Sequence, residues 1–348
     1  MEFTPTPEEL IARARADLRM GLPVRIADHL VFAVETISAR RFAAVQAMDE
    51  RAVLAVTDWR AATLKARAYD GDVARIVVPK DASLSWACAV ADPGDDLSAP
   101  MKGPFRTERE GSADVHRTGI ALAKAAHLLP AVLVVAAASS EGLTEVPLGM
   151  RGASPLSDVV SAGLPMALAG RGRLHVFRPD DGGEEHYAVE IGAPDRAAPV
   201  LTRLHSACFT GDVLGSLKCD CGPQLHGALE AMGREGAGVL LYLNQEGRGI
   251  GLVNKMRAYA LQDQGFDTVD ANHRLGFEDD ERNFALGAEL LRKLGFSAVR
   301  LMTNNPAKIA RMEDQGVHVT ERVPLRLGEN ALNAEYLATK AAKSGHLL

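Results

Sequence analysis

Three cysteines lie close together in the second half of the chain, at Cys208, Cys219 and Cys221. Three thiolates with an open fourth position are typical of a catalytic zinc, because a structural zinc usually has four protein ligands. A metal held in this way lowers the pKa of a bound water and makes it a nucleophile at cellular pH. The cluster therefore predicts a hydrolytic zinc site. Two alternatives stay open: buried cysteines without a metal, or a closed structural site with His205 as fourth ligand.

A glycine-rich loop, Glu246–Gly251, follows an apolar run at Val239–Leu243 and precedes a helix expected over Leu252–Gln264. Glycine lets backbone amides approach phosphate oxygens, and a helix N-terminus adds favourable partial charge. The glycine spacing does not match the dinucleotide-binding fingerprint. Taken alone, the loop is equally consistent with a phosphate site and with an ordinary tight turn.

Two further polar stretches carry groups that could handle a proton or a phosphate. In the run 279–282, the carboxylate of Asp280 lies near the guanidinium of Arg282, which suits acid–base work and bidentate phosphate binding. Thr303 and Lys308 follow a strand expected over Val299–Met302, at the end where α/β sheets bind nucleotides. In isolation, a solvated helix cap explains the first run better, and a capped helix start explains the second equally well.

These candidate residues need a scaffold, and the apolar runs predict an α/β pattern in both halves of the chain. In the first half we expect a capped helix from Thr6 to about Met20 and a helical segment over Gly119–Leu129. Strands are expected there at Val24–Ile26, Leu30–Val34, Ala52–Val56, Val73–Val78 and Val132–Ala138.

A stretch rich in Ser, Gly and Pro, 139–157, separates the two halves. We therefore expect two domains, 1–150 and 155–348. In the second half, a helix is expected over Phe284–Leu294, in addition to the one at Leu252–Gln264. Strands are expected at Arg173–Phe177, Tyr187–Ile191, Val239–Leu243 and Val299–Met302.

Composition narrows the possible partners. The 348 residues carry a formal net charge of −6, which disfavours a nucleic-acid binder or a zinc-structured nucleic-acid module. The longest apolar stretch, Ala121–Ala138, contains Lys124, His127 and Pro130 and is too broken for a membrane span. Met1–Glu9 does not have the pattern of a signal peptide. We expect a cytoplasmic protein without a membrane partner, in which clustered cysteines bind metal.

Together, the motifs of the second half resemble the GTP cyclohydrolase II family. The resemblance begins near Leu164 and reaches the C-terminus. The motifs that carry it are RLHSACFTGD at 203–212, GSLKCDCGPQL at 215–225, QEGRGIGL at 245–252, AYALQ at 258–262, TNNP at 303–306 and ERVPL at 321–325. Such a joint match is far more specific than any one motif.

The resemblance implies a domain with a mixed sheet and helices, preceded by a smaller α/β domain. It implies hydrolysis of GTP to a diaminopyrimidinone ribosyl phosphate, formate and pyrophosphate, the first step of riboflavin biosynthesis. The cofactors would be one zinc per chain, on Cys208, Cys219 and Cys221, and Mg²⁺ on the GTP phosphates. The family also implies a homodimer.

The resemblance assigns further roles by position. Asp280 matches the family's proposed proton acceptor, Arg282 its proposed nucleophile at the α-phosphorus, and Tyr259 a tyrosine that supports ring opening. The positions that match nucleotide contacts are Arg203, Gln224, Glu246, Gly247, Arg248, Thr268, Thr303 and Lys308.

Two positions depart from the family. Ala207 stands where the family usually has glutamate, and Asn244 stands where it usually has arginine. We favour a lost salt bridge in which each loss compensates the other, since the zinc ligands and the Asp280/Arg282 pair remain. The alternative is a catalytically impaired GTP-binding regulatory or scaffold protein.

The first half vaguely resembles dihydroxybutanone phosphate synthase at 21–24, 30–35 and 118–121. It has neither the acid-rich loop that binds magnesium there nor an Arg-x-Gly-His-Thr-Glu stretch. We therefore expect a degenerate, non-catalytic relative, with an unrelated α/β domain as the equal alternative.

Overall fold

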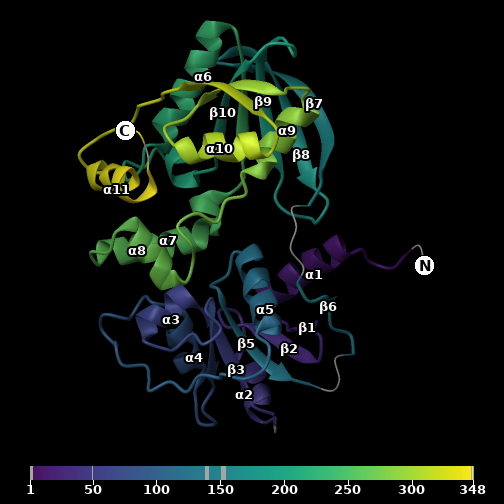
Figure 1. The fold of residues 1–348 in the computed structure, drawn as a ribbon, viewed down its shortest axis with the longest axis vertical. Helices are drawn as coiled ribbons and strands as arrows, with labels where there is room; N and C mark the ends of the chain where they lie inside the picture. The colour runs from purple at the N-terminus through teal and green to yellow at the C-terminus, as the bar shows by residue number, and fades with distance from the viewer. Residues whose placement is uncertain (1–2, 49, 138–140, 150–153, 346, 348) are drawn as a thin grey trace. The chain divides into compact units, whose positions relative to one another are not determined.

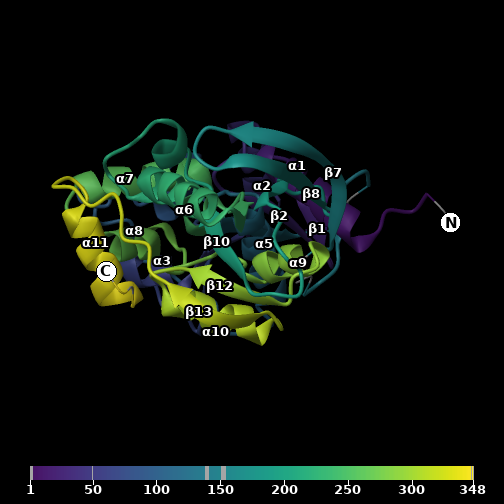
Figure 2. The same cartoon turned by 90° about the horizontal axis from the view of Figure 1, so that it is seen from above.

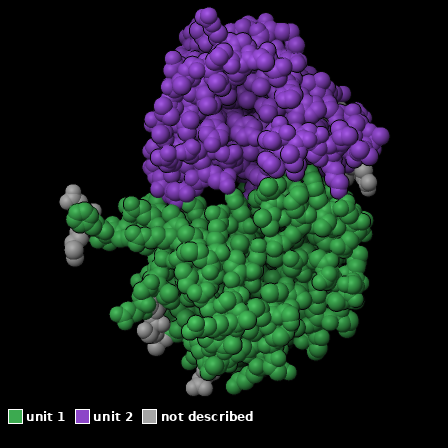
Figure 3. Space-filling model, turned by 180° about the vertical axis from the view of Figure 1, so that it is seen from behind, with its two compact units in different colours: residues 1–152, 250–281 green, residues 153–249, 282–348 purple. Residues whose placement is uncertain are grey.

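The structure is a computed structural model that describes residues 3–48, 50–137, 141–149, 154–345 and 347. The chain divides into two compact units (Figure 3): residues 1–152 and 250–281 form unit 1, and residues 153–249 and 282–348 form unit 2. The domain boundary expected between 150 and 155 falls largely on 150–153, outside the described residues. The two units are defined by which residues pack together, and each combines two separate stretches of the chain. The division into domains 1–150 and 155–348 therefore stays a prediction.

Unit 1 contains a six-stranded sheet with the order β4-β3-β5-β2-β1-β6 (Figure 1). Its neighbouring strands are antiparallel, except for the parallel pair β1–β6. The strands are β1 Val24–Ile26, β2 His29–Ala33, β3 Val53–Thr57, β4 Val73–Val77, β5 Ala131–Ala136 and β6 Glu145–Val146. The five strands expected in the first half are confirmed, although Ala138, the expected end of β5, lies outside the described residues.

Successive side chains of a strand point to opposite faces, and each face of this sheet has its own core. Val132 and Val134 pack with α1 (Pro7–Arg19) and α5 (Asp114–Ala125). Leu133 and Val135 face the other core. That core includes residues from α2 (Ala39–Gln46), α3 (Asp58–Leu64), α4 (Leu84–Ala91), α7 (Gly251–Asp263) and α8 (Thr268–Leu275).

Local chemistry explains where the first helices begin and end. The hydroxyl of Thr6 accepts a hydrogen bond from the backbone N–H of Glu9, and the Glu9 carboxylate accepts one from the backbone N–H of Thr6. The expected helix start is therefore confirmed. The expected bounds of α5 were wrong at both ends. Ala113 offers no capping side chain to mark the start, and the left-handed backbone of His127 follows the last turn.

Unit 2 contains a mixed seven-stranded sheet with the order β13-β12-β10-β11-β9-β8-β7. The four strands from β13 to β11 are parallel, and the remaining pairs are antiparallel. The strands are β7 Leu156–Met166, β8 Gly170–Pro179, β9 His186–Gly192, β10 Val200–Ser206, β11 Ala237–Leu243, β12 Ala298–Met302 and β13 His318–Val323. The expected α/β class, with a mixed sheet in the second half, is confirmed.

Helices cover both faces of this sheet. Figure 2 shows α6 (Cys221–Glu235) on one side of β10, and α9 (Ala285–Lys293) and α10 (Pro306–Asp314) on the other. Leu201 and Leu240 pack with α6, whereas Leu204 and Leu241 pack with α9. The last helix is α11 (Ala334–Ser344). None of the helices in the described part of the chain has the length and hydrophobicity that a bilayer span needs.

We did not predict β10, an interior strand of this sheet. This strand buries Thr202, Arg203 and His205 among its apolar residues, so it shows neither an apolar run nor regular alternation. Two of these polar residues, Arg203 and His205, are the side chains that β10 contributes to the candidate site.

Candidate active site

The three predicted metal ligands lie together in unit 2. Cys208 follows β10, Cys219 precedes α6, and Cys221 is the first residue of α6. Their three Sγ atoms lie within 4.8 Å of one another, and those of Cys208 and Cys219 are 3.7 Å apart. His205 is not part of this group, because its Nε2 bonds the Asp212 carboxylate at 3.0 Å. The structure therefore gives no support to the alternative of a closed site with His205 as fourth ligand.

The cluster of three thiols has a geometry that fits a zinc ion. Two ligands at the usual Zn–S length of about 2.3 Å in a tetrahedron lie about 3.8 Å apart, close to the distance between Cys208 and Cys219. Contact with the Cys208 thiol raises the pKa of Cys219 and Cys221, so a nearby cation is needed to stabilise the thiolates. A Cβ at Gly211 would lie 2.9 Å from the Cys219 sulfur, so only glycine allows this approach.

A buried carboxylate supports the first thiol. Asp212, in a π-helical turn at Phe209–Val213, accepts hydrogen bonds from the backbone N–H of Cys208 at 3.0 Å and from the Tyr242 hydroxyl at 2.9 Å. Burial, followed by the Asp212 charge, raises the pKa of Tyr242, so its hydroxyl keeps its proton. We did not predict Asp212 or Tyr242 as site residues. The available signal was the position of Asp212 four residues after Cys208.

A second polar chain connects β10 to the other two cysteines. The guanidinium of Arg203 donates to Gln224 on α6, and the Gln224 amide donates to Asp220, which lies between Cys219 and Cys221. Burial lowers the pKa of Arg203. Its Nε is buried without a hydrogen-bond partner among the described residues, so it retains a donor for a ligand. This supports the prediction that Arg203 contacts a nucleotide.

The glycine-rich loop bonds the backbone beside the first thiol. The Glu246 carboxylate accepts hydrogen bonds from the N–H of Phe209 at 2.6 Å and from the N–H of Gly247 at 3.0 Å. Gly247 and Arg248 both have left-handed backbones, with φ of 63° and 62°. A left-handed arginine is uncommon and is typical of functional sites. This backbone is also that of a tight turn, so the structure does not decide between the two interpretations of the loop, and its role in binding phosphate stays a prediction.

Three cations surround one aromatic ring in unit 2. The ring centroid of Phe284 lies 4.8 Å from the guanidinium carbons of Arg282 and Arg311, and 5.5 Å from Nζ of Lys308. Lys308 also donates to the backbone oxygen of Leu204 at 3.1 Å. Such a group of positive charges suits a polyanion such as a triphosphate. We did not predict Arg311, although its spacing of three residues from Lys308 places both on one helical face.

Thr303 directly follows β12 and lies two residues before Asn305, the N-cap of α10. Its hydroxyl accepts a hydrogen bond from the N–H of Asn305 at 3.0 Å, and Asn305 caps the helix through the N–H of Ala307. The capped helix start is therefore confirmed, and a nucleotide role for Thr303 stays a prediction. The helix-cap alternative for 279–282 was wrong, because α9 begins only at Ala285 and has no side-chain cap.

The remaining predicted residues, Tyr259, Thr268 and Asp280, belong to unit 1. Tyr259 lies on α7, where Nζ of Lys255 is 5.7 Å from its ring centroid. Thr268 is the first residue of α8 and accepts a hydrogen bond from Gln262 at 3.1 Å. Asp280 lies before the division at 281/282, and Arg282 lies just after it. The roles of these residues stay predictions.

Ala207 and Asn244 extend the same pair of strands. The parallel register of β10 and β11 ends at Ser206 opposite Leu243, and the N–H of Ala207 donates to Leu243 at 2.8 Å. The next residues, 207 and 244, are therefore neighbours. The Asn244 amide donates to the backbone oxygen of Glu185 at 2.5 Å. This adjacency supports the interpretation that the two departures compensate each other.

Comparisons with known proteins point to one family. A family model described as GTP cyclohydrolase II matches residues 157–324. The chain is 43% identical to a GTP cyclohydrolase-2 of Azospirillum brasilense over 359 residues, which cover 97% of this chain and 93% of that protein. It is 58% identical to a GTP cyclohydrolase-2 of Azotobacter vinelandii over 175 residues, which cover 50% of this chain and 84% of that protein.

Among solved structures, this chain was compared with a two-domain 3,4-dihydroxy-2-butanone 4-phosphate synthase from A. baumannii. The alignment includes 92% of this chain and 99% of the synthase chain. The identity is 14% and the TM-score is 0.30, which is too low to relate the folds. The expected likeness of the first half to such a synthase stays a prediction.

Proposed function

Because this chain belongs to the GTP cyclohydrolase II family, we propose that it hydrolyses GTP with one zinc held by Cys208, Cys219 and Cys221. The proposed products are the diaminopyrimidinone ribosyl phosphate, formate and pyrophosphate. The observation that carries the proposal is the meeting of three Sγ atoms within 4.8 Å. A zinc ion there would supply the Lewis acid that activates water against the imidazole ring of guanine.

The surrounding residues hold this cluster in place. Asp212 fixes the backbone of Cys208, and the chain from Arg203 through Gln224 to Asp220 fixes the turn between the other two cysteines. Groups that orient the ligands of a metal raise its affinity and set its geometry. Arg203 has a further role in this proposal: its Nε, which has no hydrogen-bond partner in the described part of the chain, donates to the nucleotide.

We place the triphosphate at the cations around Phe284. Arg282, Lys308 and Arg311 would bind the phosphate oxygens, and Mg²⁺ would neutralise the pyrophosphate that leaves. Arg282 would attack or clamp the α-phosphorus, and Asp280 would accept the proton. In the same proposal, Tyr259 supports ring opening, and Glu246, Gly247, Arg248, Thr268 and Thr303 contact the nucleotide.

The test is an assay of the full-length chain with GTP, zinc and magnesium, in which the pyrimidine product, formate and pyrophosphate are measured. The Cys219→Ser variant should lose formate release and retain some pyrophosphate release. The matched control is Cys88→Ser. Cys88 lies outside the cluster of three thiols, so its replacement should change neither formate release nor pyrophosphate release. Formate release by Cys219→Ser would contradict the role of zinc.

The same assay addresses the competing hypothesis. GTP binding without turnover in the unmodified protein would support a catalytically impaired regulatory or scaffold protein. A homodimer and a cytoplasmic location remain parts of the proposal. Light scattering of the purified chain tests the first, and fractionation of the source cells tests the second.

A further inference from the structure

The segment 250–281 lies within the family match but packs with the N-terminal half, residues 1–152. The chain leaves unit 2 after Gly249 and returns to it at Arg282. Between these points, α7 and α8 share a hydrophobic core with the sheet of the N-terminal half. The residues that the segment contributes are Ile250, Ala258, Leu261, Ala271, Leu275 and Phe277.

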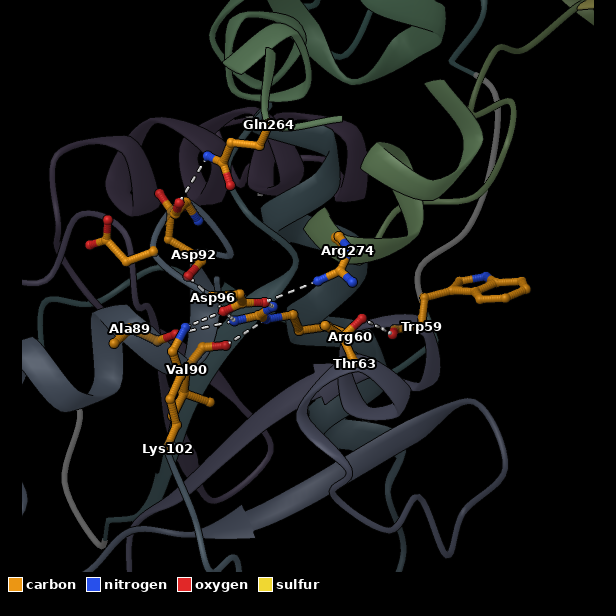
Figure 4. A network of polar contacts seen from close by, with 12 residues as sticks. Trp59, Arg60, Thr63, Ala89, Val90, Asp92, Asp96, Lys102, Gln264 and Arg274 are labelled. Carbon is orange, nitrogen blue, oxygen red and sulfur yellow. Dashed lines mark hydrogen bonds and ion pairs between the residues drawn. The ribbon is translucent and has the colours of Figure 1, made fainter. Parts of the chain in front are cut away.

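Ion pairs join the same two parts of unit 1. Arg257 on α7 lies 3.1 Å from Glu35 and 3.3 Å from Asp92. Arg274 on α8 lies 3.8 Å from Asp96 and points toward it in Figure 4. Because the Glu35 and Asp96 side chains are largely buried, water screens these pairs less than it screens surface pairs.

An aromatic stack closes the contact at α8. The rings of Trp59 on α3 and His273 are 3.6 Å apart and almost parallel. The indole N–H of Trp59 also donates to Glu278 at 3.0 Å. Near the end of the segment, Nζ of Lys124 lies 2.6 Å from the Glu281 carboxylate. Contacts with the N-terminal half thus extend from α7 to the last residue of the segment.

We propose that the N-terminal half is a built-in clamp, which positions the segment 250–281 for the reaction. The inference rests on the proposed function, because Tyr259, Thr268 and Asp280 all lie in this segment. Each is close in sequence to a clamped residue: Tyr259 follows Arg257 by two positions, and Asp280 precedes Glu281. Catalytic groups need rigid support, and small displacements reduce the rate strongly.

The first variant is Trp59→Ala in the full-length, zinc-loaded chain. It removes the stack on His273 and the bond to Glu278, and we expect faster deuterium uptake in 268–281. We expect kcat for GTP to fall roughly tenfold because the segment is displaced. Zinc content should not change, since the thiols lie in unit 2. The conservative variant Trp59→Phe keeps a stacking ring and should recover most of the rate.

The matched control is Tyr69→Ala, which removes an exposed aromatic ring whose cation–π contacts are with Arg67 and Arg109. It should change neither exchange nor kcat. A second test variant, Glu35→Gln, removes the charge opposite Arg257 and keeps an oxygen for the N–H of Leu129. It should lower kcat with little loss of folded protein.

Unchanged kcat in both Trp59→Ala and Glu35→Gln would overturn the clamp, even if the melting temperature fell, because a purely structural contact would behave in this way. The proposed function is tested separately by Tyr259→Phe and Asp280→Asn. Wild-type rates in those variants would contradict the roles of Tyr259 and Asp280. The comparison of Trp59→Ala with Tyr69→Ala would still decide whether the N-terminal half sets the rate.

Discussion

The carboxylate of Asp212 accepts a hydrogen bond from the backbone N–H of Cys208 at 3.0 Å, so a group outside the thiol cluster fixes the position of its first sulfur. The same carboxylate bonds the Tyr242 hydroxyl and the imidazole of His205. A carboxylate with three donors is held rigidly on both sides. These three hydrogen bonds therefore hold the turn that carries Cys208.

Replacement of Asp212 by asparagine should weaken zinc binding. An amide has one acceptor oxygen instead of two, so it cannot bond Cys208, Tyr242 and His205 as the carboxylate does. We expect the zinc dissociation constant to rise by about tenfold to a hundredfold. Competition with a chromophoric chelator measures this constant. The control is Asp195→Asn, an exposed aspartate that bonds the N–H of Ala197. Equal affinities in Asp212→Asn and the unmodified chain would contradict the role of Asp212.

Replacement of Arg311 by glutamine should weaken GTP binding and leave the metal site intact. The variant removes one of the three cations around Phe284. Loss of one charge-assisted bond to phosphate should raise the KM for GTP roughly tenfold. Steady-state kinetics at two salt concentrations measure the change. The control, Arg234→Gln, removes an exposed cation on α6. A KM like that of the control would place the triphosphate elsewhere.

His116 should make the protein less stable in mild acid. Burial lowers the pKa of this imidazole to about 4, from 6.5 for an ordinary histidine. As the pH falls below 6.5, the unfolded chain binds the proton and the folded chain does not, so the free energy of unfolding decreases. Between pH 7 and pH 5 this costs about 2 kcal/mol, and at pH 4 the loss reaches roughly 3 kcal/mol.

The variant His116→Leu tests this linkage. Both ring nitrogens of His116 are buried without a hydrogen-bond partner among the described residues, so leucine leaves no partner unpaired. Urea unfolding at pH 7 and pH 5 should show a loss about 2 kcal/mol smaller than in the unmodified chain. His226→Leu, at an exposed position on α6, should retain the full loss. Parallel pH curves for all three proteins would refute the prediction.

Ala207→Glu and Asn244→Arg should be coupled. These positions are neighbours at the ends of β10 and β11, so the double variant can form an ion pair that neither single variant forms. A double-mutant cycle on the free energy of unfolding should give a coupling of about 0.5–1 kcal/mol in favour of the double variant. Additive effects would show that the two departures do not compensate each other.

The sequence by itself predicted the thiol cluster and most strands, because these depend on residue types and short-range periodicity. Cys219 and Cys221 are separated by one residue, and the N-cap at Thr6 requires only the next turn. The strands β1 to β5 appeared as apolar runs for the same local reason. Family motifs supplied the remaining predicted roles, which no local pattern in this chain encodes.

Other features were decided only by the tertiary structure. The carboxylate of Asp212 meets Tyr242 across 30 positions of the chain, and the ring of Trp59 stacks on His273 across more than 200. Contacts between residues so far apart in the sequence depend on how sheets and helices pack, and local residue patterns do not predict this packing. The sequence therefore determined which atoms could bind a metal. Packing decided which groups hold those atoms, and placed the segment 250–281 against the N-terminal half, because its apolar faces are buried there.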